Sequence, residues 1–313
     1  MKVIKPKKLK KGDVIGIISP ASNPDDLTKI ENSIKYLESL GYRVEIGKNV
    51  GKTHGYLAGT DEERLEDLHD MFRNKQVKAV FSIRGGYGSG RLLDKINYNL
   101  IKKNPKIFVG YSDITALQMA FLKKCGLVTF AGPMLAVDFY GKINPYAEEN
   151  FWKVLTASKK IGKLHNPREE KFYVLNKGRA EGMLLGGNLA VLNSLFATPY
   201  MPDFKNSILL LEEIGEEPHR IDRFLNQLKL AGVFKKTHGV VLGRFVDCYV
   251  KDKSQNTIKL NEVIEHYLGN VEIPVLYSFS HGHIKENITV PFGVNCKINT
   301  GKCFFEITES AVT

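Results

Sequence analysis

The sequence predicts an α/β protein with a parallel sheet in its N-terminal half and a smaller, β-rich domain after it. Three observations lead to this fold class. Apolar runs of strand length alternate with segments of helical apolar spacing over the first 131 residues. A polar, basic stretch then interrupts the pattern near 153–177, and the rest of the chain is richer in strands and less regularly alternating. A chain of 313 residues is long enough for two domains of ordinary size.

The N-terminal half reads as a series of strand–helix units. Regular alternation at this spacing is typical of a parallel sheet with helices on both faces. One helix opens with Thr60 and Glu63 at the spacing of a capping box, and another ends before Gly126. The expected strands are 14–18, 43–46, 77–83, 107–109 and 128–131, and the main expected helices are 25–40, 60–72 and 114–125.

The polar stretch divides the chain into a first domain over 1–155, a linker over 156–176 and a second domain over 177–313. A helix over 218–230 has Pro218 at a first-turn position, where proline is favoured. The second domain is expected to hold strands at 180–185, 208–211, 240–243, 274–277, 287–290, 294–298 and 303–307, with a further helix through 192–195.

The amino-acid composition excludes several classes of protein. The formal charge of +11 comes from lysines spread along the chain, without the motifs or the basic stripe of a nucleic-acid binder. No apolar segment approaches a membrane span, and the basic start lacks the apolar stretch of a signal peptide. The four cysteines include no C-x-x-C pair. We therefore expect a cytoplasmic protein that binds a small molecule, with no nucleic-acid or membrane partner.

Candidate site residues follow the ends of the predicted strands, where parallel sheets bind their ligands. The loop 84–90 matches neither a P-loop nor a G-x-G-x-x-G phosphate motif. It can direct N–H groups at an oxyanion or a substrate, or it can be a flexible turn. Ser112 follows Gly110 on a strand-to-helix turn, where a serine is either an exposed nucleophile or an ordinary N-cap.

Two further groups lie near strand ends in the second half. Glu212 follows four apolar residues, and His281 and His283 flank Gly282. An H-x-H pair without a clear third ligand is a weak metal motif. A serine needs a base to take its proton, and a carboxylate orients that base, so the order Ser112, Glu212, histidine fits a hydrolase triad.

The sequence resembles the LD-carboxypeptidase family of serine peptidases, which includes muramoyltetrapeptide carboxypeptidases and microcin C self-immunity hydrolases. The resemblance covers nearly the whole chain. It rests on Ile83-Arg84-Gly85-Gly86-Tyr87-Gly88, Gly110-Tyr111-Ser112-Asp113, Phe130-Ala131-Gly132-Pro133-Met134, Leu185-Gly186-Gly187-Asn188-Leu189, Leu210-Leu211-Glu212-Glu213 with Arg220-Ile221-Asp222-Arg223, and Gly282-His283.

The resemblance implies a Rossmann-like N-terminal domain and a catalytic triad completed across the domain interface. The implied nucleophile is Ser112, the base His283 and the orienting carboxylate Glu212. His283 is favoured over His281 because the family histidine follows the glycine, and the family usually has aspartate where this chain has Glu213. The oxyanion would bind the N–H groups of Gly86 and Asp113, and the other expected substrate-binding residues are Arg84, Tyr87 and Asn188.

The expected activity is a metal-independent serine carboxypeptidase, without cofactor, that releases C-terminal D-alanine from murein tetrapeptides in cell-wall recycling. A homodimer is expected by the same resemblance. One alternative is a microcin-immunity-type hydrolase of peptidyl or aminoacyl nucleotides, although no insertion carrying an aromatic platform for a nucleobase is evident. A more distant alternative is a non-catalytic anion- or nucleotide-binding module.

Overall fold

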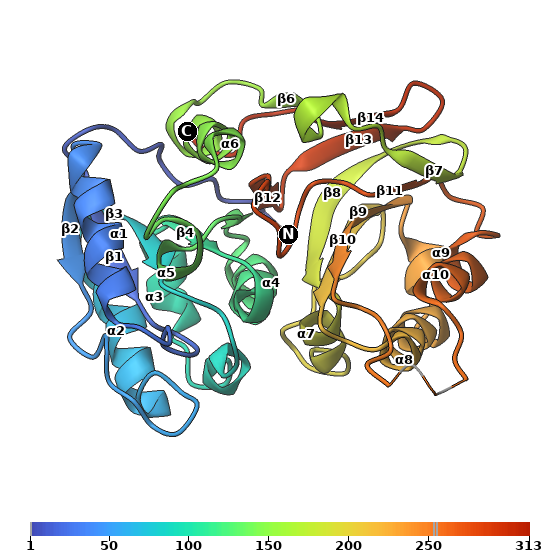
Figure 1. Ribbon diagram of the computed structural model, residues 1–313. Coiled ribbons are helices and arrows are strands. Elements are labelled where there is room, and N and C mark those ends of the chain that lie inside the picture. Colours follow the sequence, from blue (N-terminus) through green and yellow to red (C-terminus); the bar gives the residue numbers. More distant parts are fainter. Residues whose placement is uncertain (1, 253, 255) are drawn as a thin grey trace.

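The computed structural model describes residues 2–252, 254 and 256–313, and in this part of the chain two sheets lie side by side (Figure 1). In the first sheet the N-terminal strands are parallel and one strand from the C-terminal region pairs antiparallel with β5. Its order is β12 (Val290–Phe292), β5 (Thr129–Ala131), β4 (Ile107–Gly110), β3 (Val77–Ser82), β1 (Val14–Ile18) and β2 (Arg43–Ile46).

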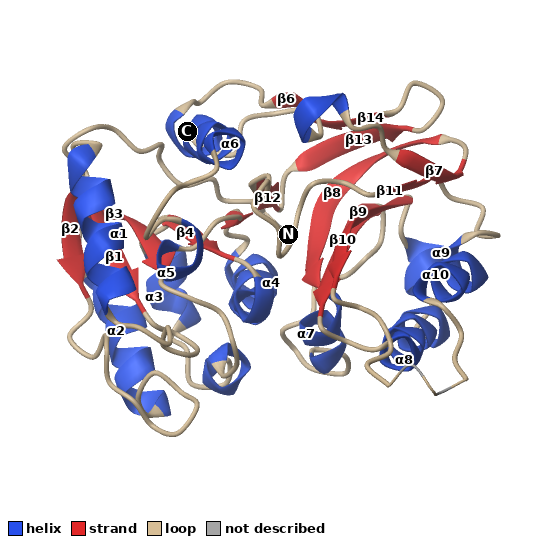
Figure 2. Cartoon of the chain, viewed as in Figure 1, coloured by secondary structure: helices blue, strands red, loops and turns tan. Residues whose placement is uncertain are grey.

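Helices cover both faces of this sheet, as Figure 2 shows in blue against red strands. They are α1 (Thr28–Ser39), α2 (Asp61–Arg73), α3 (Tyr98–Lys103), α4 (Thr115–Cys125), α5 (Leu135–Asp138) and α6 (Pro145–Thr156), with short 3₁₀ turns at Ser89–Leu92, Ser112–Ile114 and Pro167–Glu169. The capping box predicted for Thr60 and Glu63 is confirmed at the start of α2, and Gly126 ends α4 in the left-handed conformation.

The two faces follow from side-chain alternation along the strands. Phe108 of β4 packs against Phe72 of α2 and Phe121 of α4. Phe81 of β3 points to the opposite face, where it meets Phe151 of α6 edge-on. Since both faces are buried, the strands can be almost wholly apolar, as the sequence has them.

The second sheet has a parallel centre and antiparallel edges. Its order is β6 (Gly162–Leu164), β14 (Phe304–Ile307), β13 (Asn295–Asn299), β8 (Arg179–Asn188), β9 (Ser207–Ile214), β10 (Gly239–Val246), β11 (Val275–Tyr277) and β7 (Tyr173–Asn176). The helices packed with it are α7 (Leu189–Ser194), α8 (Pro218–Leu230), α9 (Val233–Lys236) and α10 (Leu260–Leu268). The predicted fold class, α/β with two domains, is confirmed.

The segments that belong to each sheet differ from those expected from the sequence. The segment 156–176, expected to be a linker, contributes the edge strands β6 and β7 to the second sheet. In the other direction, β12 returns to the first sheet. Edge strands such as β6 and β7 keep polar side chains and need no long apolar run, which is why composition alone suggested a linker.

Several element boundaries also differ. The strand expected at 287–290 begins only at Val290, and β9 continues through Glu212 to Ile214. The helices α6 and α10 had no counterpart in the sequence analysis. For α6 the signal was present, because Asn144 caps the helix through the N–H groups of Tyr146 and Ala147, and Pro145 follows at its first position.

Candidate active site

Ser112 lies on a sharp turn between β4 and α4. It has φ of 61°, a left-handed conformation that is uncommon for a residue other than glycine. The turn requires Gly110, because a Cβ there would lie 2.7 Å from Cγ2 of Ile114. Ser112 is not the N-cap of α4, since that position belongs to Ile114. The backbone thus raises the serine hydroxyl out of the sheet, as a strand–turn–helix elbow does.

The Ser112 hydroxyl is the first member of a hydrogen-bonded chain of three side chains. Its Oγ lies 3.0 Å from Nε2 of His283, and Nδ1 of the same ring lies 2.8 Å from Oε2 of Glu212. The Glu212 side chain is 1% exposed and that of His283 is 15% exposed. The structure therefore brings together the three residues that the sequence singled out, from both halves of the chain.

The second sheet positions the carboxylate and the imidazole. Glu212 is paired with Asn188 of β8 and follows the apolar residues of β9, so its side chain enters the interior. Gly282 precedes His283 at φ of 121°, and a Cβ there would lie 2.7 Å from Oε2 of Glu212. A glycine is therefore required for the imidazole to approach Glu212.

The charge environment favours protonation of His283. Burial alone lowers the pKa of this imidazole, but the hydrogen bond and the charge of Glu212, together with the charges of Glu213 and Asp138, outweigh it. The net result is a His283 pKa raised above its ordinary value of 6.5. Such a base gains affinity for a proton while it stays within hydrogen-bond distance of Ser112.

The loop after β3 lies directly against Ser112. A Cβ on Gly85 would be 3.1 Å from Cβ of Ser112 and 3.3 Å from the backbone nitrogen of Asp113. The predicted oxyanion donors, the N–H groups of Gly86 and Asp113, therefore belong to segments in contact beside the hydroxyl. The N–H of Asp113 is in the first turn of a helix, where it has no partner within the helix.

The remaining predicted binding residues differ in the exposure of their side chains and in the hydrogen bonds that these side chains already make. Tyr87 is exposed and stacks edge-on with Tyr56, at 5.6 Å between ring centroids. Arg84 donates a hydrogen bond of 2.8 Å to the carbonyl of Asn23. Asn188 is buried, donates to Glu213 at 2.9 Å, and accepts from the N–H of Val191 as the N-cap of α7. The substrate-binding roles of all three stay predictions.

Two residues beside the imidazole were missed in the sequence analysis. The ring of Tyr111 lies 5.0 Å from that of His283, and the charge of Asp138 helps to raise the pKa of His283. Burial raises the pKa of Asp138 to about 6. Tyr111 directly precedes Ser112, but nothing in the sequence connects Asp138 with the site, because a short helix brings it there.

His281 does not take part in this chain of hydrogen bonds. It is buried, its Nδ1 lies 2.8 Å from the carbonyl oxygen of Ile288, and burial lowers its pKa. Within residues 2–252, 254 and 256–313, no group of three or more His, Cys, Asp or Glu side chains could hold a metal ion. The same range contains no helix long and apolar enough to cross a membrane.

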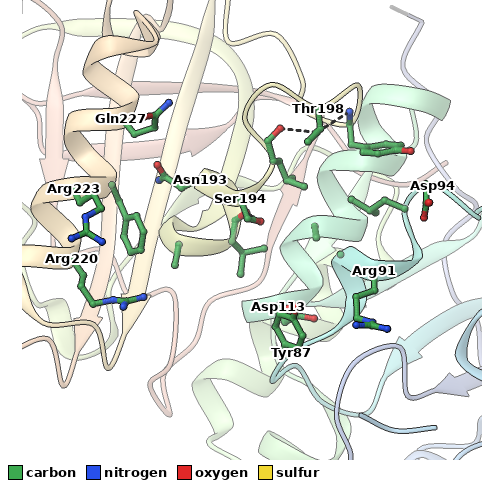
Figure 3. A pocket seen from close by; sticks show the side chains of 18 residues that line it. Tyr87, Arg91, Asp94, Asp113, Asn193, Ser194, Thr198, Arg220, Arg223 and Gln227 are labelled. Atoms are coloured by element: carbon green, nitrogen blue, oxygen red, sulfur yellow. Dashed lines mark hydrogen bonds between the residues drawn. The ribbon is translucent and has the colours of Figure 1, made fainter. Parts of the chain in front are cut away.

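A cavity of about 990 Å³ lies between the two halves of the chain and reaches Asp113, the residue after Ser112 (Figure 3). Asp113 and Tyr87 contribute to one wall, and the helices α7 and α8 form the other. This volume is at the upper end of the range of about 300 to 1,000 Å³ that is usual for small-molecule sites. The cavity, which is much larger than one amino acid, therefore reaches the residue that follows the nucleophile candidate, whereas Ser112, Glu212 and His283 do not line it.

The sequence matches two family models in chain order. Residues 15–132 match the LD-carboxypeptidase N-terminal domain, and residues 181–298 match the C-terminal domain of the same family. This chain belongs to the LD-carboxypeptidase family. The resemblance drawn from the motifs is therefore confirmed.

The proteins to which this chain is similar include murein peptide carboxypeptidases and a microcin self-immunity protein. The chain is 42% identical over 299 residues to the probable murein peptide carboxypeptidase of Bacillus subtilis, covering 95% of this chain and 92% of the relative. It is 32% identical over 329 residues to the microcin C7 self-immunity protein MccF of Escherichia coli, covering 95% and 94%. The crystal structure of muramoyltetrapeptide carboxypeptidase from Oxalobacter formigenes superposes with a TM-score of 0.83 at 32% identity, covering 95% and 98%.

Family membership makes this protein a hydrolase of the serine carboxypeptidase type. The relatives are matched over nearly their whole lengths, so both halves of the fold are shared with them.

Proposed function

We propose that this protein is a serine L,D-carboxypeptidase that releases terminal D-alanine from murein tetrapeptides. The observation that carries the proposal is the double hydrogen bonding of His283, to Ser112 through Nε2 and to Glu212 through Nδ1. A neutral imidazole held in this way is protonated at Nδ1 and has Nε2 free to accept the serine proton. The relatives that act on murein peptides supply the substrate class.

The proposed reaction proceeds in two steps. Oγ of Ser112 attacks the carbonyl carbon of the scissile amide while His283 takes the hydroxyl proton. The N–H groups of Gly86 and Asp113 stabilise the oxyanion of the tetrahedral intermediate. His283 then gives the proton to the leaving amine of D-alanine, which leaves an acyl ester on Ser112. A water molecule, deprotonated by the same imidazole, hydrolyses the ester and restores the serine.

Glu212 orients the imidazole and stabilises its protonated form. Its position inside β9, with a side chain almost fully shielded from water, supports this role because an unscreened carboxylate interacts more strongly with a developing cation. Together, Ser112, His283 and Glu212 form the proposed catalytic triad, and no step of the proposed mechanism uses a metal.

The proposal includes a cytoplasmic location and a homodimer. The four cysteines are all unpaired in the structure, as they would be in a reducing compartment. Light scattering on the purified protein tests the dimer.

The experiment that tests the function is D-alanine release from a murein tetrapeptide by the native protein, by Ser112→Ala and by His283→Ala, with and without chelator. We expect activity that survives chelator and is lost in both variants. Turnover that depends on metal, or that persists in Ser112→Ala, would contradict the mechanism.

A second candidate function is hydrolysis of peptidyl or aminoacyl nucleotides, which the similarity to MccF supports. The same triad would serve this chemistry, so only the substrate distinguishes the two. Turnover of an aminoacyl sulfamoyl-adenylate, measured beside the tetrapeptide, separates them. A native protein that binds these ligands but cleaves neither would instead favour the non-catalytic module.

A further inference from the structure

The motif Arg220-Ile221-Asp222-Arg223 has no role in the proposed chemistry, yet its two arginines line the cavity that reaches Asp113. Four residues of α8 reach this cavity, and their spacing of i, i+3, i+4 and i+7 places them on one face of the helix. They are Arg220, Arg223, Phe224 and Gln227. In Figure 3, Arg220 extends from α8 toward the side of the cavity where Asp113 and Tyr87 lie.

The arginines of this face carry more positive charge than the protein neutralises. Arg220 pairs with Glu216 and lies over the ring of Phe224. Arg223 is exposed and makes no hydrogen bond or ion pair with any other described residue. Two guanidinium groups therefore share one carboxylate on the cavity side of α8, which leaves a net positive charge there.

Among the described residues, no carboxylate of the opposite wall forms an ion pair with Arg220 or Arg223. Arg91 of that wall is already paired with Asp61, through Nε and Nη2. The Asp113 carboxylate accepts from the N–H of Ser89 at 2.8 Å and is buried. Asp94 lines the same cavity, on the side away from α8 (Figure 3). The α8 face is thus suited to an anion of the ligand.

We infer that Arg220 and Arg223 form a subsite for a carboxylate on the acyl part of the substrate, and so select diaminopimelate over lysine at the residue before D-alanine. This inference rests on the proposed function. The cavity reaches Asp113, the residue after the proposed nucleophile, and its volume of about 990 Å³ is more than a D-alanine would fill, so we place the acyl part of the substrate in it. Diaminopimelate differs from lysine by one additional carboxylate at the end of its side chain, and planar guanidinium groups bind carboxylates through paired hydrogen bonds.

The test compares two murein tetrapeptides that carry either diaminopimelate or lysine before the terminal D-alanine. The native protein is expected to favour the diaminopimelate peptide at least tenfold in kcat/KM, mainly through KM, since a hydrogen bond to a charged group changes affinity by about 10- to 100-fold. In Arg223→Gln and in Arg220→Gln/Arg223→Gln this preference should fall, toward unity in the double variant. Arg223 is exposed and has no hydrogen bond or ion pair among the described residues, so the single variant should fold normally.

Two further variants test the inference: one should raise the preference for the diaminopimelate peptide, and the other is a control that should leave it unchanged. Glu216→Gln removes the carboxylate paired with Arg220 and should raise the preference about threefold or more. Lys229→Gln removes one positive charge from the same helix, but Lys229 lies over the ring of Tyr267 and does not line the cavity. That variant should keep the native preference.

The outcomes separate this inference from the proposed function. If the native protein releases no D-alanine from either peptide, the proposed function fails. If it cleaves both peptides equally well, or keeps its preference in the double variant, the function stands and the carboxylate subsite is wrong. An equal loss on both peptides in the double variant would assign the arginines to the terminal carboxylate and would also overturn the inference.

Discussion

Replacing Glu212 by glutamine removes one negative charge from the proposed triad while it preserves the size of the side chain. Oε2 of Glu212 lies 2.8 Å from Nδ1 of His283, so the centres of the two groups are about 4 Å apart. At that separation a buried charge pair interacts by about 4 kcal/mol when the effective dielectric constant is about 20. This interaction develops only as the imidazole accepts the serine proton, so its loss raises the barrier rather than KM.

We therefore expect Glu212→Gln to lower kcat for D-alanine release by about a thousandfold, because each 1.36 kcal/mol corresponds to a factor of ten. The assay is steady-state release of D-alanine from the tetrapeptide, followed from about pH 5.5 to 9. The pKa of His283 is raised chiefly by Glu212, against the effect of burial, so the acid limb of kcat/KM should also move to lower pH in the variant.

Glu213→Gln is the matched control for this experiment. Glu213 is the neighbouring buried carboxylate, but its oxygens accept from the side chain of Asn188 and from the N–H groups of Ala190 and Ile214. Its replacement should cost less than about tenfold in kcat, provided that thermal melting shows a folded protein. A loss of less than tenfold in Glu212→Gln, or equal losses in the two variants, would refute the electrostatic role of Glu212.

Three further predictions test the surroundings of the site and the stability of the fold. Gly282→Ala should lower kcat by about a hundredfold in a folded protein, since its Cβ would displace Oε2 of Glu212, and unchanged kinetics would contradict this packing. Asp138→Asn should shift the acid limb of kcat/KM to lower pH, because the charge of Asp138 helps to raise the pKa of His283; a limb that stays in place would exclude that contribution. Burial lowers the pKa of Lys106 from 10.5 to about 8. Between these two pH values the lysine is protonated in the unfolded chain but largely neutral in the folded protein. The free energy of unfolding should therefore rise with pH over this range, by up to about 3 kcal/mol. Denaturant titrations at pH 8 and 10.5 should show this rise in the native protein and not in Lys106→Met.

The sequence alone determined most of the first sheet. Its strands are nearly continuous apolar runs because both faces are buried, and capping residues such as Thr60 mark where helices begin. The motif around Ser112 was also readable, since a strand–glycine–serine–helix order is local. Its orientation was not, because the left-handed backbone at Ser112 depends on the packing of Gly110 against Ile114.

Tertiary structure decided which distant groups meet. Sequence order offered Ser112, Glu212 and two histidines as candidates, and the motifs favoured His283, but only the folded chain brings Nε2 of His283 within 3.0 Å of the serine hydroxyl. Asp138 could not be found from the sequence, because its approach to the imidazole depends on how a short helix packs, and its pKa depends on burial.

The edge strands of the second sheet could not be predicted from the sequence either. The strands β6 and β7 are short and partly polar, so their pattern does not differ from that of a connecting segment, and only their pairing partners make them strands. The return of β12 to the first sheet has no local signal either. Local patterns are encoded over a few residues, whereas partners and burial arise from contacts between segments far apart in the chain. The sequence therefore determined the fold class and the candidate residues, and the tertiary structure decided how they come together.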